Sequence, residues 1–273
     1  YYALAKPVIS DGEYDRMMSE LIDLEERHPS LRSPHSPSQR IGGKPVSDFP
    51  TVSHATPMLS LDNSYSREDI EMFHQRVARG LSDEPLAYVA ELKIDGVALS
   101  LIYEDSALVR AVTRGDGTQG DEITNNARTI RSIPLRLRQE GISCEVRGEV
   151  YMEHADFARL NNEREARSEA LFANPRNSTA GSLKQQDPTV VASRSLRFFA
   201  YSLDELGAPT ATHTLNMERL RTLGLPVNSA QQRCKTVEDV LGFYAQYEDA
   251  RGELPYDIDG VVIKVDDLSQ RER

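Results

Sequence analysis

Lys93 stands beside an acid in a stretch with the pattern of two strands. Residues 86–103 read LAYVAELKIDGVALSLIY, in which two alternating apolar runs meet at Asp95-Gly96. An Asp-Gly pair between such runs predicts a tight hairpin whose two central residues take positive φ. Because side chains alternate along a strand, Glu91 and Lys93 are expected to share one face. The opposite face is predicted to enter the core with Tyr88, Ala90, Leu92 and Ile94.

A lysine in this position is either a solvated surface residue or a nucleophile. Only the neutral amine is nucleophilic, and an ordinary lysine has a pKa of about 10.4. Neighbouring positive charge would favour the neutral form of Lys93, whereas an unneutralised Glu91 would oppose it. The four residues Lys-x-Asp-Gly do not decide between these two interpretations, so the rest of the chain has to.

Three further motifs follow in order, RGEV at 147–150, FFAY at 198–201 and DIDGVVIK at 257–264. Together with Lys-x-Asp-Gly they resemble the motifs of the covalent nucleotidyltransferases, the group of DNA ligases, RNA ligases and capping enzymes. Several long motifs in a fixed order are far more specific than one short pattern. Lys93 is therefore interpreted as the nucleophile.

Within that group the chain most closely resembles the bacterial NAD-dependent DNA ligases. This resemblance rests on TRGDGTQGDEIT at 113–124, NPRN at 174–177 and AGSLKQQDP at 180–188. It extends from Tyr1 to about Asp267.

The resemblance implies an α+β fold, the covalent nucleotidyltransferase fold of antiparallel sheets flanked by helices. A small helical domain with its linker is expected at residues 1–48, and an adenylation domain at 49–273. The last motif of the family, its OB-fold, its zinc module, its helix-hairpin-helix unit and its BRCT domain are expected outside this chain.

The implied reaction is attack by Lys93 on the α-phosphate of NAD, which releases nicotinamide mononucleotide (NMN) and leaves lysyl-AMP. This is the first step in sealing nicks in duplex DNA. In the family, the residue matching Glu91 recognises the adenine amino group, and Lys264 is expected to stabilise charge on the phosphate. Glu149 and Asp259 are expected to hold the ribose and the water shell of Mg2+, without direct ligation of the metal. The other expected nucleotide contacts are Ser60, Leu61, Arg114 and Tyr201, and the candidates for later steps on DNA are Arg176, Lys184 and Arg251.

Two of these assignments stay open in the sequence. Tyr201 can stack on adenine or be an ordinary core aromatic. Asp259 and Lys264 have opposite parity, so an unbroken strand would point them to opposite faces. If both serve the site, a bulge near Gly260 must redirect one of them.

The N-terminal helix, expected from Ser10 to about His28, carries the second group of candidates. Asp11, Tyr14 and Asp15 recur at helical spacing and share one face. Acids in a first turn can also serve only the helix dipole. In the family this pattern binds the NMN half of NAD, and the matching residues here are Tyr1, Tyr2, Asp11, Gly12, Glu13, Tyr14 and Asp15.

The composition adds limits on partners. The chain has 273 residues, 27% of them charged, and a net charge of -11. Duplex binding needs neutralisation of phosphates by Lys and Arg, so weak binding of nicked DNA is expected for this chain alone. A possible phosphate-facing patch comprises Arg110, Arg114, Arg128, Arg131, Arg136 and Arg138. No membrane span and no leader are expected. The chain is also expected to be a monomer and to lie in the bacterial cytoplasm, associated with the nucleoid.

Cysteine and histidine provide no metal signature. Cys144 and Cys234 are far apart and are interpreted as reduced thiols. The histidines lack ligand spacing, and zinc is expected only in the C-terminal module of the family. His74 lies on the apolar stripe of a predicted helix and is interpreted as a packed residue.

The remaining pattern predicts the elements that position the site. Helices are expected at 67–77, 154–167, 215–223 and 236–247, strands at 107–113, 142–152, 196–203 and 258–265, a linker at 29–57 and a polar loop at 174–188. Two other functions remain as alternatives. An ATP-dependent ligase or capping-type enzyme would have no use for the N-terminal tyrosines and aspartates, and a non-catalytic nucleotide-binding module would never modify Lys93.

Overall fold

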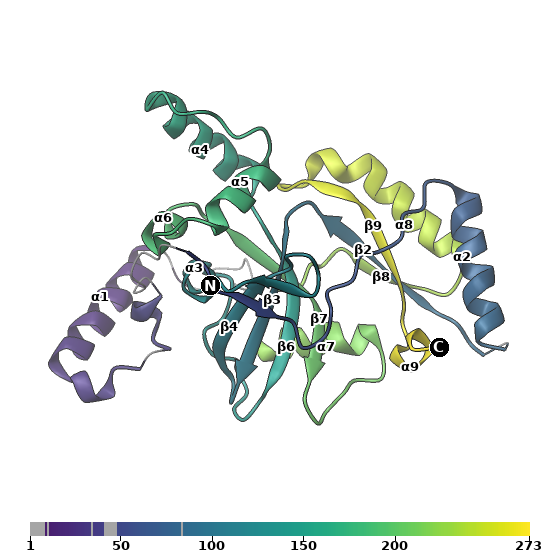
Figure 1. Ribbon diagram of the computed structural model, residues 1–273, viewed down its shortest axis with the longest axis horizontal. Coiled ribbons are helices and arrows are strands. Elements are labelled where there is room, and N and C mark those ends of the chain that lie inside the picture. Colours follow the sequence, from purple (N-terminus) through teal and green to yellow (C-terminus); the bar gives the residue numbers. More distant parts are fainter. Residues whose placement is uncertain (1–8, 10, 34, 41–47, 83) are drawn as a thin grey trace.

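The computed structural model describes residues 9, 11–33, 35–40, 48–82 and 84–273. Two antiparallel sheets lie side by side in the main body, with helices around them and α1 projecting to one side (Figure 1). The helices are α1 Asp11–Arg27, α2 Arg67–Gly80, α3 Thr124–Thr129, α4 His154–Ala166, α5 Pro175–Leu183, α6 Pro188–Ala192, α7 His213–Leu223, α8 Val237–Ala250 and α9 Leu268–Arg271. Short 3-10 helices occupy Pro29–Leu31, Pro37–Gln39 and Arg251–Glu253. This arrangement confirms the expected α+β fold.

The strands form three sheets. Their bounds are β1 Thr51–Ser53, β2 Tyr88–Ile94, β3 Val97–Glu104, β4 Ala107–Thr113, β5 Gln119–Asp121, β6 Cys144–Tyr151, β7 Arg197–Glu205, β8 Gln231–Cys234 and β9 Ile258–Val265. The larger sheet has the order β4-β3-β6-β7, the second has β8-β2-β9, and β1 pairs with β5. The linker predicted at 29–57 therefore contributes a strand, β1, to the main body.

The predicted hairpin at Asp95-Gly96 is wrong. β2 and β3 belong to different sheets, and neither central residue takes positive φ. The Asp95 N–H donates to the Asp257 carbonyl at 2.9 Å. A Cβ atom on Gly96 would lie 2.2 Å from the Val150 carbonyl oxygen. Glycine is therefore needed at this position because the chain passes close to β6 as it crosses from one sheet to the other, and any side chain there would clash with the β6 backbone.

The four-stranded and the three-stranded sheet each have a core of their own. Tyr88, Ala90, Leu92 and Ile94 are buried in the second sheet as predicted. They pack with Val240 and Phe243 of α8. His74 is packed as predicted, with its Nδ1 atom 2.8 Å from the Tyr88 hydroxyl. The core of the larger sheet includes residues from all four of its strands and from α3 and α7.

The predicted polar loop at 174–188 is wrong over most of its length, because residues 175–183 form α5. The Asn174 side chain caps this helix by accepting from the Asn177 N–H at 2.7 Å, and Pro175 takes the first helical position. Ser178, Thr179 and Ser182 are buried. Small hydroxyl residues tolerate such burial when they bond to the preceding turn, as Thr179 does to the Pro175 carbonyl at 2.9 Å. The polar composition of this segment is typical of a loop, although the segment folds as a packed helix.

The other expected elements are confirmed with shifts of a few residues. The strand at 107–113 has the bounds predicted for it, as does the strand at 258–265. Helix α8 begins with a capping box, in which Thr236 Oγ accepts from the Asp239 N–H at 3.1 Å. In the part of the chain that the structure describes, no helix is long and apolar enough to cross a membrane.

Candidate functional site

The second sheet presents one charged face, which we call the Lys93 face because it carries Glu91, Lys93, Asp259 and Lys264. The Lys93 ammonium contacts the Asp259 carboxylate, and both side chains are about two-fifths exposed, at 42% and 38%. Arg176 extends from α5 to the same place. Its Nη1 atom lies 2.8 Å from Asp95 Oδ1 and 3.7 Å from Asp259 Oδ2. Lys93 is thus accessible and is surrounded by charges of both signs.

A bulge in β9 brings Asp259 to this face. Lys93 pairs with Gly260, whereas Ile94 pairs with Ile258, so Asp259 is an extra residue without a cross-strand partner. Gly260 has a φ of 152°, in a region that favours glycine. Lys264 pairs with Val89 in the regular part of the strand. The bulge therefore reconciles the opposite parity of Asp259 and Lys264, as the sequence predicted.

A second charged group lies two residues along β2 from Lys93. The Lys264 ammonium donates to Glu91 Oε2 at 2.7 Å and to the Tyr201 carbonyl at 3.3 Å. His213, from the start of α7, contacts the other carboxylate oxygen of Glu91 through its Nε2 atom. Burial alone would raise the pKa of Glu91, but Lys264 and His213 outweigh it and hold that pKa at about 2. Glu91 is therefore a fixed anion that only accepts hydrogen bonds.

Glu149 approaches Lys93 from β6 of the larger sheet. Burial raises the pKa of its carboxyl to about 8, and the opposing attraction of Arg176 and Lys93 does not cancel the effect. Tyr201 also comes from the larger sheet, at a bulge where Arg147 pairs with Ser202 but Gly148 pairs with Ala200. Its ring centroid lies 5.2 Å from the Lys264 ammonium. Two strands of the larger sheet thus deliver groups to the Lys93 face.

The buried carboxyl of Glu149 predicts a pH effect on stability. Its pKa is about 8 in the folded chain and about 4.5 when unfolded, so the folded state binds the proton more tightly. The resulting stabilisation is complete below about pH 4.5 and is lost as the pH rises from there through 8. The free energy of unfolding falls by at most about 1.4 kcal/mol per pH unit in this range. Glu149→Gln removes this titration. We expect the melting temperature of the variant to match that of the wild type at pH 4 and to exceed it at pH 8. Equal pH dependence of the two proteins would contradict the assigned burial of charge.

Two arginines tie the segment before α2 to the larger sheet. Arg114 donates to the Met58 carbonyl at 3.2 Å and to Ser60 Oγ at 2.6 Å. Arg147 donates to the Thr56 and Pro57 carbonyls at 2.5 and 3.0 Å. Ser60 is thereby joined to Arg114, whereas the next residue, Leu61, is 57% exposed.

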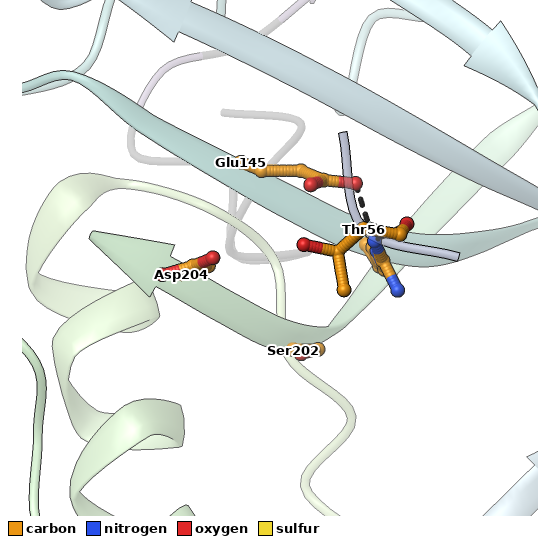
Figure 2. Close-up of a pocket in the computed structure, with 5 residues that line it drawn as sticks. Thr56, Glu145, Ser202 and Asp204 are labelled. Carbon is orange, nitrogen blue, oxygen red and sulfur yellow. Dashed lines mark hydrogen bonds and ion pairs between the residues drawn. The ribbon is translucent and has the colours of Figure 1, made fainter. Parts of the chain in front are cut away.

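A polar cavity of about 180 Å3 lies further along the same face of β6 (Figure 2). It is lined by Thr56, Glu145, Arg147, Ser202 and Asp204. Arg147 also donates to Glu145 at 2.8 Å, and Ser100 donates to the same carboxylate oxygen at 2.7 Å. No residue of the Lys93 face lines this cavity, so it is separate from the candidate site.

Of the remaining predicted site residues, some lie at the Lys93 face and others lie elsewhere in the structure. Arg176 joins the Lys93 face, whereas Lys184 pairs with Asp121 at 2.8 Å, and Arg251 begins a 3-10 helix after α8. Tyr1 and Tyr2 lie outside the described residues, as do the side chains of Asp11, Tyr14 and Asp15. Gly12 and Glu13 belong to α1, where Glu13 is exposed. Among the described residues, no cluster of three or more His, Cys, Asp or Glu side chains suits a metal ion.

Sequence reasoning missed two residues of the site. Asp95 was assigned only to a turn, although its place in Lys-x-Asp-Gly was a signal for function. His213 had no such signal, because a single histidine at the start of a helix has no informative spacing. Only the tertiary structure, in which α7 packs against β7 and its first residue meets Glu91 of β2, reveals this contact.

Comparisons with known proteins identify the family to which this chain is similar. A family model described as NAD-dependent DNA ligase adenylation domain matches residues 46–273, and one described as DNA ligase-like, N-terminal NAD+-binding domain matches residues 1–42. The DNA ligase of Brevibacillus brevis is 51% identical over 273 residues, covering 100% of this chain and 40% of that protein. The DNA ligase of Anoxybacillus flavithermus is 50% identical over 276 residues, with the same coverage. That of Bacillus subtilis is 49% identical over 275 residues, covering 100% of this chain and 41% of that protein.

This chain therefore spans about two-fifths of the length of these relatives. The adenylation-domain match includes every residue of the Lys93 face. With most of its residues inside that match and about half of them identical in the DNA ligases above, the chain belongs to the NAD-dependent DNA ligase family.

Proposed function

We propose that this chain catalyses the transfer of an adenylyl group from NAD to its own Lys93. The Lys93 nitrogen attacks the α-phosphorus of the AMP half, the bond from phosphorus to the bridging oxygen breaks, and NMN leaves with that oxygen. The ammonium nitrogen loses two of its three protons in the process and keeps the third in the N–P linkage, and the Asp259 carboxylate in contact with it is the nearest acceptor that can relay the released protons to solvent. The contact of an accessible Lys93 with Asp259 beside Arg176 is the observation that carries this proposal.

The groups at the other end of the Lys93 face suit the adenine base. A purine amino group donates hydrogen bonds, and the ring nitrogen beside it accepts one. Glu91 is a fixed acceptor, and Lys264 retains a third N–H after its contacts with Glu91 and Tyr201. An acceptor on Glu91 beside a donor on Lys264 favours recognition of the adenine base as the role of Lys264. The phosphate role expected for it from the family stays a prediction.

Asp259 contacts Lys93, and the carboxyl group of Glu149 lies near enough for the charge of Lys93 to act on its pKa. Oxygen ligands suit Mg2+, which usually keeps several of its waters. Asp259 already contacts Lys93 and Arg176, so we propose that both carboxylates hold the metal through its water shell and that Glu149 also holds the ribose. When bound, Mg2+ would neutralise charge that develops on the phosphate.

Intact-mass measurement after incubation with Mg2+ and either NAD or ATP tests the proposed reaction. We expect the mass of the chain to increase by one AMP group with NAD and to stay unchanged with ATP. Labelling by ATP would favour the ATP-dependent alternative, and no labelling by either nucleotide would favour a non-catalytic binding module.

The substrate of the whole enzyme is proposed to be nicked duplex DNA. The name of the relatives supports this, but the chain spans only about two-fifths of their length and has a net charge of -11. We therefore propose that it binds DNA weakly by itself, because phosphate contacts need an excess of cations. Tight binding of nicked duplex in a gel shift at physiological salt would contradict this proposal. The domain boundary near residue 48, the monomeric state and the cytoplasmic, nucleoid-associated location likewise stay predictions, open to limited proteolysis, sedimentation and cell fractionation.

A further inference from the structure

We propose that His213 is a positioning residue that holds the Glu91 carboxylate in the orientation that reads the adenine of NAD. This role rests on the adenylyl transfer proposed above. His213 is 1% exposed, and its Nε2 atom contacts Glu91 Oε1 from the first position of α7. Lys264 holds the other oxygen at 2.7 Å. Both oxygens of the carboxylate are therefore held by contacts, one from each of two segments that are distant in the sequence.

The charge states make His213 the donor in this contact. Glu91 is ionised and can only accept, so the proton must lie on Nε2 of His213. Burial and the nearby Lys264 lower the pKa of His213, although Glu91 opposes them, which keeps the ring neutral. A neutral donor orients the carboxylate without adding a second positive charge to the Glu91–Lys264 pair. Glu91 thus keeps its capacity to accept a hydrogen bond from a base.

The start of α7 is itself fixed to the end of β9. The His213 N–H donates to the Asp266 carbonyl at 2.7 Å, and the N–H and hydroxyl of Thr214 donate to the Asp266 carboxylate at 3.0 and 2.9 Å. Arg233 donates to the other oxygen of that carboxylate at 2.6 Å. Asp266 lies two residues beyond Lys264, so His213 and Lys264 are held in register with each other. Rotation of the Glu91 carboxylate therefore requires breaking a buried contact.

This rigidity has a consequence for the choice of base. Each oxygen of Glu91 has a second lone pair that can accept from the amino group of adenine. Hypoxanthine carries a carbonyl oxygen at that position, which a fixed carboxylate repels. Without the His213 contact the carboxylate can turn away with Lys264, and the penalty against hypoxanthine decreases. A fixed partner discriminates better because the wrong base leaves its polar groups unpaired.

The test compares NAD with nicotinamide hypoxanthine dinucleotide as adduct-forming substrates of this chain, with Mg2+ present. For His213→Leu we expect the second-order rate constant for adduct formation with NAD to fall about 10-fold, mainly through a weaker apparent affinity for NAD, because a hydrogen bond to a charged group is lost. We expect the preference for NAD over the hypoxanthine analogue to fall by a similar factor. His213→Gln restores an N–H donor and should recover much of the rate with NAD and much of the preference for NAD. His74→Gln is the matched control, because His74 contacts β2 through Tyr88 on the opposite face.

A binding measurement keeps the test independent of chemistry. The ratio of the Kd for inosine monophosphate to the Kd for AMP should fall in His213→Leu and recover in His213→Gln. Equal losses for both bases, with an unchanged ratio, would show that His213 only supports packing and would overturn the role proposed for it. A wild-type chain that binds AMP with base preference but forms no adduct would instead overturn the proposed function and leave the binding ratio to decide the role of His213.

Discussion

Lys93→Arg is expected to abolish the AMP adduct on this chain. Arginine keeps the positive charge that contacts Asp259 but stays protonated at any accessible pH, so it offers no neutral nitrogen to attack phosphorus. The Lys93 side chain is 42% exposed, so the substitution should change the free energy of unfolding by about 0.5 kcal/mol or less. Loss of reaction without loss of fold is the expected signature of a nucleophile.

Intact-mass analysis with NAD and Mg2+ measures this effect, together with a melting temperature for each protein. Lys235→Arg provides the matched control, because Lys235 is an exposed lysine just before α8. The control should be adenylated at the rate of the wild type. An adduct of undiminished yield on the Lys93→Arg variant would assign the nucleophile to another residue.

Removal of residues 1–48 is expected to reduce adenylation by NAD by roughly two orders of magnitude or more. The family resemblance predicts that residues in this segment contact the NMN half of NAD, and such contacts act only while NMN is still attached, so their loss should affect this step and no later one. Aromatic and acidic groups match a flat, cationic nicotinamide ring, whereas acids would repel a triphosphate. Tyr14→Ala and Asp15→Ala should show the same defect in milder form. Asp23→Ala, an exposed acid on the same helix, is the matched control.

The structure shows how to separate this effect from instability. Arg40 donates to the carbonyls of Arg128, Ile130 and Ile133 at 3.0, 3.2 and 2.9 Å, so a deletion through residue 48 also removes three contacts with the main body. A shorter deletion that ends at Ser33 keeps Arg40. Both deletions should impair NAD labelling, and a pre-adenylated full-length chain carrying either should still react onward. NAD labelling indifferent to both would favour the ATP-dependent alternative.

Local patterns predicted much of the fold because they report which side of each element meets the core. The alternation in β2 identified its buried face, and the apolar stripe of α2 identified His74 as packed. The same alternation required a bulge near Gly260 if Asp259 and Lys264 were to act together, and β9 contains it. These are effects of the two-residue and 3.6-residue periods, which need no knowledge of distant partners.

Distant partners were needed for the rest. Asp95-Gly96 carries the local signature of a hairpin, but Gly96 is required by the Val150 carbonyl of another sheet, and the sequence does not encode that approach locally. The helix at 175–183 is polar in composition, so only its burial against neighbouring elements distinguishes it from a loop.

The sequence by itself determined the nucleophile candidate, the family resemblance and the faces of the strands, since these depend on residue types in order. Only the tertiary structure decided which charges meet: Asp259 with Lys93, Arg176 with Asp95, and His213 with Glu91. Electrostatic and hydrogen-bond energies depend on distances of a few ångströms and on exclusion of water, and both arise when segments 81 to 166 residues apart in the sequence pack together.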